Sequence, residues 1–197
     1  MDKDYDIFKV ITHADGGDAY STNATKYPSN EDSVAVRGYG VDADDPATAK
    51  IQFDSLAKYH GNERKNEFIQ FMLSPLKETA PDAETAMAII DQVLDPLKDE
   101  YLILTGAHKK EHQKSDYHTH SYVGTTNLET GKMLHPTNKL TYKMAQRMAD
   151  IIQNPVKLVI EKKDKSPEPD SSQNGDNNSE EKKDFTRIFY PHKNTNN

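Results

Sequence analysis

The sequence predicts an α+β domain in which a central, mostly antiparallel sheet is flanked by helices. Two observations predict this class. Short apolar runs typical of strands alternate with longer segments in which apolar residues recur every three or four positions. In addition, the strand-like runs 101–107 and 117–123 follow each other with no helical segment between them. Two strands joined without a helix usually pair antiparallel, so a sheet with antiparallel strands is favoured over a doubly wound parallel sheet.

Two strands and two helices are expected in the first hundred residues. Residues 5–13 and 67–74 have the composition of strands. One helix begins at Pro46 and another at Pro81, because proline is favoured in the first helical turn. Each helix carries an apolar stripe at helical spacing: Ala49, Phe53 and Leu56 in the first, and Ala86, Ile89, Ile90, Val93 and Leu97 in the second. The polar stretch 18–28 receives no assignment.

The second half is expected to add the hairpin, a helix and a closing strand. After the hairpin strands, the composition of residues 127–132 indicates a turn. A third helix over 138–152 has its own apolar stripe: Leu140, Met144, Met148, Ile151 and Ile152. Residues 156–160 form a short last strand, so the folded unit is expected to span residues 1–160.

A disordered tail is expected over residues 161–197. Between Glu161 and Asp184 the chain has no aliphatic or aromatic residue. Such a segment buries too little apolar surface to offset the entropy lost on ordering. The apolar run 185–190 that follows is interpreted as a frayed end rather than a docking peptide.

Composition limits the functional classes. The 197 residues suit one domain, and the absence of cysteine excludes disulfides and thiolate metal ligands. No apolar stretch approaches the roughly 18 residues of a membrane span, and the acidic N-terminus lacks the pattern of a signal peptide. A soluble, cytoplasmic protein is therefore expected. The formal net charge of −7 counts against a generic DNA-binding protein, which would carry a basic excess.

Three histidines form the most informative pattern in the chain. His118 and His120 are two residues apart in an expected strand, so their side chains project to the same face. His108 ends the preceding strand, and pairing of the two strands would bring all three imidazoles together. Imidazole is a common ligand of divalent transition metals, so the pattern predicts a metal site, with His112 as an alternative third ligand.

Several segments together resemble a known family. The residues around His108, the His118–His120 strand and the turn 127–132 look like the third motif of plasmid mobilisation relaxases. These enzymes, with MobA/MobL-like nuclease domains, belong to the HUH endonuclease superfamily. Two upstream segments match the family in the same order: residues 38–53 and the strand 68–74. The resemblance covers about residues 8–160.

The resemblance implies a function and a set of roles. A relaxase binds single-stranded DNA at a transfer origin, where a tyrosine oxygen attacks one phosphodiester and leaves a 5′-phosphotyrosyl link. Tyr20 stands where the family's nucleophile would fall, and Tyr27 is the second candidate. The resemblance gives His108, His118 and His120 the role of holding a divalent ion, Mn²⁺ or Mg²⁺, against the phosphate, with accessory mobilisation proteins as possible partners.

Basic residues near the histidines in sequence are the expected DNA contacts. The main candidates are Lys109, Lys132, Lys139 and Lys143, with Lys110, Lys114 and Arg147 beside them. They would line a groove for the phosphate backbone. A charged face exposed only to solvent would show the same sequence pattern.

Three alternatives remain open at this level. A replication initiator of the same superfamily would carry its tyrosine after the histidine strand, where Tyr142 is the candidate. A non-catalytic DNA-binding accessory protein would explain the net acidity, and also Lys110 and Gly124 at positions where the family usually has Asp and Asn. A small zinc hydrolase would need a general base that the sequence does not place near the histidines.

Overall fold

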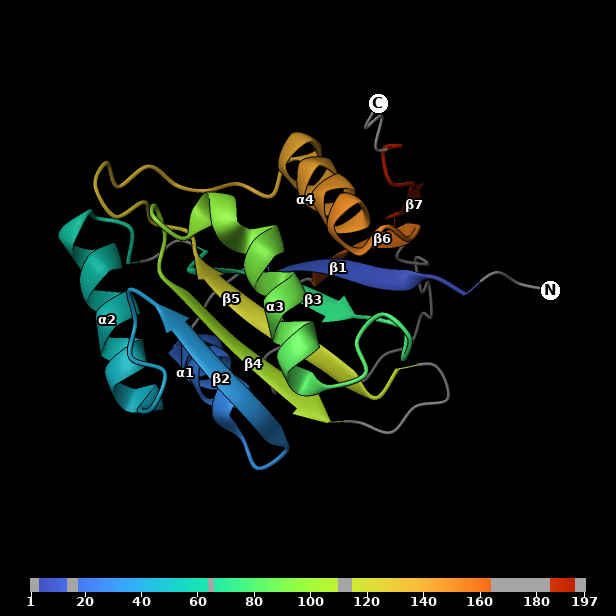
Figure 1. Cartoon of the computed structure of the whole chain (residues 1–197). Helices are drawn as coiled ribbons and strands as arrows, with labels where there is room; N and C mark the ends of the chain where they lie inside the picture. The colour runs from blue at the N-terminus through green and yellow to red at the C-terminus, as the bar shows by residue number, and fades with distance from the viewer. Residues whose placement is uncertain (1–3, 14–17, 64–65, 110–114, 164–184, 194–197) are drawn as a thin grey trace, which may run out of the picture.

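Seven strands form one sheet in the order β2-β4-β5-β3-β1-β6-β7 (Figure 1). The computed structural model describes the chain except residues 1–3, 14–17, 64–65, 110–114, 164–184 and 194–197. The strand bounds are β1 Asp6–His13, β2 Ser33–Tyr39, β3 Phe68–Ser74, β4 Ile103–Lys109, β5 Tyr117–Gly124, β6 Val156–Lys163 and β7 Phe185–Phe189.

The pairing confirms the predicted fold class. In the described part of the chain, β1 and β6 pair in parallel and the other five strand pairs are antiparallel. The strands expected at 101–107 and 117–123 are β4 and β5, which form the predicted antiparallel pair. Strand β2 was not predicted from the sequence, and it forms one edge of the sheet.

Within the described ranges, four α-helices flank the sheet: α1 Asp18–Lys26, α2 Pro46–Tyr59, α3 Ala83–Leu94 and α4 Asn138–Ile152. The last three confirm predicted helices, and each begins after a capping side chain that accepts backbone N–H groups: Asp45, Asp82 and Thr137. Helix α3 begins two residues later than predicted, because Asp82 and not Pro81 caps it, and Leu97 lies in the turn that follows α3. Helix α1 occupies most of the stretch left unassigned. A single 3₁₀ turn, η1 (Tyr27–Ser29), follows it directly, and η2 (Asp95–Leu97) follows α3.

The two faces of the sheet are covered differently. Helices α3 and α4 pack on one face, which is called the apolar face below. They enclose a large cluster of buried apolar side chains that includes Phe71, Ile90 and Met148. Helices α1 and α2 lie across the other face of the central strands (Figure 1) and share a smaller cluster with Phe53, Phe68 and Tyr122. Side chains alternate between faces along each strand, and the second face also carries the three histidines. It is called the histidine face below.

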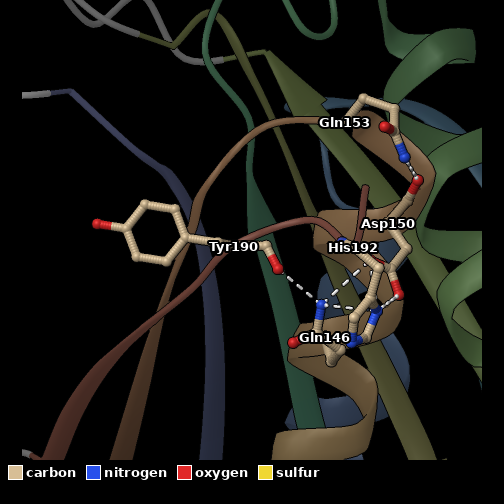
Figure 2. A network of polar contacts seen from close by, with 5 residues as sticks. All are labelled: Gln146, Asp150, Gln153, Tyr190 and His192. Carbon is tan, nitrogen blue, oxygen red and sulfur yellow. Dashed lines mark hydrogen bonds and ion pairs between the residues drawn. The ribbon is translucent and has the colours of Figure 1, made fainter. Parts of the chain in front are cut away.

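The C-terminal segment differs from the sequence prediction. Strand β6 extends to Lys163, and residues 185–189 pair with it as β7 instead of fraying. Beyond β7, the Nδ1 atom of His192 lies 2.9 Å from Asp150 Oδ2 on α4, and Gln146 Nε2 donates to the Tyr190 carbonyl at 2.8 Å (Figure 2). Aromatic residues explain the docking, because Phe185 and Phe189 both contact the Tyr142 ring of α4. Residues 164–184 and 194–197 of the expected tail lie outside the described residues.

Within the described residues, no helix combines the length and the apolar character that crossing a membrane requires.

Candidate metal centre

Three histidines converge on the histidine face, as the predicted hairpin requires. His108 on β4 is directly opposite His118 on β5, and His120 is opposite Gly106. The ring centroids are 5.0–5.6 Å apart, and one potential ligand nitrogen from each ring lies within 4.8 Å of the others. Among the described residues, this is the only group of three or more His, Cys, Asp or Glu side chains with such spacing. His112 lies outside the described residues.

Burial keeps two of these imidazoles neutral. His108 and His120 are 2% and 7% exposed. Burial, reinforced by the neighbouring His118 and His108, lowers the pKa of His120 to about 3. Burial also lowers the pKa of His108, although the carbonyls of Pro28 and Tyr27 oppose the shift. A neutral imidazole keeps one nitrogen lone pair, which is the form that binds a metal ion.

Gln70 of β3 fixes the orientation of the His120 ring. Its side-chain amide lies 2.8 Å from His120 Nδ1, and the contact is buried. The other ring nitrogen, Nε2, is buried without a hydrogen-bond partner among the described residues. With the amide oxygen turned toward Nδ1–H, the Nε2 lone pair is left for a cation. A buried, unpaired nitrogen beside two further imidazoles fits a divalent metal ion.

Tyr27 lies directly against the histidine cluster. Its ring centroid is 4.7 Å from that of His108 and 4.8 Å from that of His120, with both contacts edge-to-face. Tyr27 is 39% exposed and lines a pocket beside α1. Burial and the nearby Asp32 raise the pKa of Tyr27, so the phenol is protonated at neutral pH.

Gly106 explains how η1 reaches this position. It lies on β4 between Leu104 and His108 on the histidine face. A Cβ atom at Gly106 would overlap the backbone of Pro28, the residue after Tyr27. The missing side chain therefore lets η1 lie flat on the strand, and this places Tyr27 over the two histidines. Glycine within a strand is a sequence signal for such a close approach.

Tyr20 lies in a different environment. It sits on α1, where its ring meets Phe68 edge-on with centroids 6.2 Å apart, within the smaller apolar cluster. Burial raises the pKa of Tyr20 well above its usual range. The described ring contacts join the histidines to Tyr27 and not to Tyr20. Tyr142 is on α4, at the apolar face, so it is separated from the histidines by the sheet.

The four lysines expected to contact DNA do not gather at the histidines. Lys139 and Lys143 are on α4, which covers the apolar face. Lys109 follows His108 and therefore points to the side opposite it. Lys132 is in the turn that follows the C-terminal end of β5, whereas His118 is near the N-terminal end of that strand. Among the described residues, Lys26 at the end of α1 lines the same pocket as Tyr27.

A mixed sheet with three histidines on a central hairpin is the arrangement that the relaxase resemblance implies. Residues 20–156 match the family model described as relaxase, MobA/VirD2-like, nuclease domain. The match covers more than half of the sequence, so the chain belongs to this family. The resemblance inferred from the sequence motifs is thereby confirmed.

One solved relaxase structure also matches the chain. The chain matches the conjugative relaxase TrwC, in a metal-bound complex with oriT DNA, at 13% identity and a TM-score of 0.45. The match covers 72% of this chain and 68% of the chain in that structure. Curated proteins gave no match.

Proposed function

We propose that this chain nicks single-stranded DNA at a transfer origin of a plasmid or other mobile element, with Tyr27 as the nucleophile. The observation that carries the proposal is the contact of the Tyr27 ring with His108 and His120. A phosphate held at the histidines would lie next to the Tyr27 side chain. The described contacts of Tyr20 are with Phe68 and the smaller apolar cluster, whereas those of Tyr27 include two histidines, and this difference favours Tyr27 as the nucleophile.

The proposed reaction is a transesterification. The Tyr27 oxygen attacks the phosphorus, the bond to the 3′-oxygen breaks, and the 3′-oxygen leaves as a hydroxyl after taking up a proton. The phenol loses its own proton as the new bond forms, because the raised pKa of Tyr27 keeps it neutral beforehand. A divalent ion at the site would withdraw charge from the phosphate oxygens. His108, His118 and His120 would hold that ion, and a three-imidazole site suits Mn²⁺ better than Mg²⁺.

The covalent intermediate provides the test. Wild-type protein, Tyr27→Phe and Tyr20→Phe are incubated with Mn²⁺ and a pool of single-stranded oligonucleotides, and protein–DNA adducts are separated under denaturing conditions. We expect Tyr27→Phe to abolish the adduct and Tyr20→Phe to retain it. If Tyr27→Phe forms the adduct and Tyr20→Phe does not, the nucleophile is Tyr20 and the proposal for Tyr27 is wrong. An adduct that survives both substitutions would contradict a role for either residue.

A non-catalytic DNA-binding accessory protein is the second candidate. The net charge of −7 and the substituted motif positions Lys110 and Gly124 favour it. It predicts DNA binding that needs neither Tyr27 nor a metal ion, and no adduct from the wild type. The initiator alternative is weaker, because its tyrosine candidate, Tyr142, lies behind the sheet. Under the first proposal, accessory mobilisation proteins would be partners in the cytoplasm.

A further inference from the structure

A pocket of about 400 Å³ opens beside the histidine cluster, between α1, η1 and β5. It is lined mainly by Tyr20, Asn23, Lys26, Tyr27, Asn30 and Tyr122. Tyr27 belongs to both the pocket and the histidine cluster. A ligand group in the pocket would therefore lie next to any group held at the histidines.

The lining combines aromatic rings, amides and one cation. Burial raises the pKa of Tyr20 and of Tyr122 well above the usual range, so both phenols stay uncharged. Asn30 uses its Oδ1 to accept the Asp32 backbone N–H at 3.1 Å, and its Nδ2 makes no hydrogen bond within the described part of the chain. The Asn23 side chain is exposed and likewise makes none there.

A pocket of similar size on α4 provides a contrast. Its volume is about 430 Å³, and its lining includes Gln146, Arg147 and Asp150. These polar groups already have partners. Gln146 and Asp150 contact His192 (Figure 2), and Arg147 Nε donates to the Gln92 carbonyl. Burial of Asp150 raises its pKa, but hydrogen bonds from His192 and Gln146 outweigh this effect and lower it. The polar groups of the α4 pocket thus hold the C-terminal segment. In the α1 pocket, the Asn23 amide and the Asn30 Nδ2 group remain available to a ligand.

We propose that the α1 pocket receives the unstacked base of the nucleotide next to the scissile phosphate and selects its identity. This inference rests on the proposed function. Aromatic side chains provide stacking surfaces for a base, and asparagine amides hydrogen-bond base edges with both a donor and an acceptor. Lys26 at the rim suits a backbone phosphate, which carries no sequence information. Asn23 and Asn30 are therefore the specificity-determining residues, and Lys26 adds affinity for any sequence.

The test measures base preference at each position of a bound strand. A library of randomised single-stranded DNA is selected by binding to Tyr27→Phe protein, a background that keeps the ring and removes the nucleophile. Asn23→Leu and Asn30→Asp are compared in that background, and the latter retains the Oδ1 acceptor. Asn154→Leu serves as a matched control, since Asn154 is exposed and hydrogen-bonds Thr79, away from this pocket. Thermal unfolding midpoints establish that each variant is folded.

We expect the two pocket variants to lose base preference at one position by about fivefold or more, with the other positions and the Asn154→Leu control unchanged. Lys26→Gln should weaken binding to all sequences equally and reduce its salt dependence. A preference profile that is the same in all variants, or flat in the parent protein, would overturn the base pocket. Adduct formation by the wild type is assayed separately, so failure of the pocket and failure of the nicking proposal give different results.

Discussion

The two faces of the sheet use the same strands for different purposes. On β5, Val123 faces the large apolar cluster, whereas its neighbour Tyr122 belongs to the smaller cluster with α1 and α2. On β3, Phe71 packs into the apolar face and Gln70 binds His120. The period of two along a strand makes this division possible, because one face can carry stability while the other holds polar groups at fixed distances. Buried polar side chains are thus tolerated beside a well-packed core.

The largest expected effect comes from breaking the apolar face. Phe71 is fully buried and stacks on Phe8 with ring centroids 5.8 Å apart. Phe71→Ala should lower the free energy of unfolding by about 3–5 kcal/mol, because it removes buried surface and leaves a cavity. Urea unfolding measures the change. Met72→Ala, at the half-buried neighbour on the histidine face, is the control and should cost clearly less. If the two variants lose the same free energy of unfolding, the apolar face does not contribute more to stability than the histidine face.

The second effect concerns the pH dependence of the histidine face. In the unfolded chain a histidine takes up a proton below pH 6.5, whereas His120 in the folded protein does so only near pH 3. The unfolded state therefore binds more protons in this window. The free energy of unfolding should fall as the pH drops from 6.5 toward 3, by up to about 1.4 kcal/mol per pH unit from His120.

His120→Gln should remove that contribution. Urea unfolding at several pH values, with chelator present, compares the slope of stability against pH in the two proteins. His108 contributes in the same direction, because its pKa is also lowered, so the variant should keep part of the slope. An unchanged slope in His120→Gln would show that His120 is not held neutral by burial.

The smallest expected effect tests the support that Gln70 gives to the histidines. Gln70→Leu should weaken Mn²⁺ binding about 10- to 100-fold, since residues that orient a metal-binding imidazole commonly contribute that much. Gln70→Glu retains an acceptor for Nδ1–H and should bind Mn²⁺ at least as well as Gln70→Leu does. Calorimetric titration provides the affinities. If Gln70→Leu binds as tightly as the wild type, the contact with His120 has no orienting role.

The sequence predicted the strands, helices and histidine convergence well because their signals are local. Alternation along 117–123 and pairing with 101–107 are enough to bring the three imidazoles together. The lysines predicted to contact DNA lie apart from the histidines, because nearness in sequence does not ensure nearness in space. Lys109 adjoins His108 but faces the other way, and the basic side of α4 lies beyond the sheet. Alternation applied to Lys109 would have given its direction in advance.

The position of Tyr27 depends on contacts between distant segments. The polar stretch 18–28 has too weak a periodicity to predict α1, and nothing local relates it to β4. The informative signal was Gly106, whose missing side chain admits the backbone of Pro28. Strand β7 was missed for a similar reason, since residues 164–184 separate it in sequence from the rest of the sheet.

The parallel pairing of β1 with β6 has a consequence for the order of folding during synthesis. The histidine hairpin joins strands that are close in the chain, so its loop closes quickly and with little loss of entropy. Strand β1 is made first, yet one of its two neighbours begins only at Val156. Until β6 has been synthesised, the backbone groups along one edge of β1 have no partner strand, and an open strand edge can pair with other chains. The nascent protein is therefore most prone to aggregation after its histidine hairpin has formed and before its sixth strand has emerged.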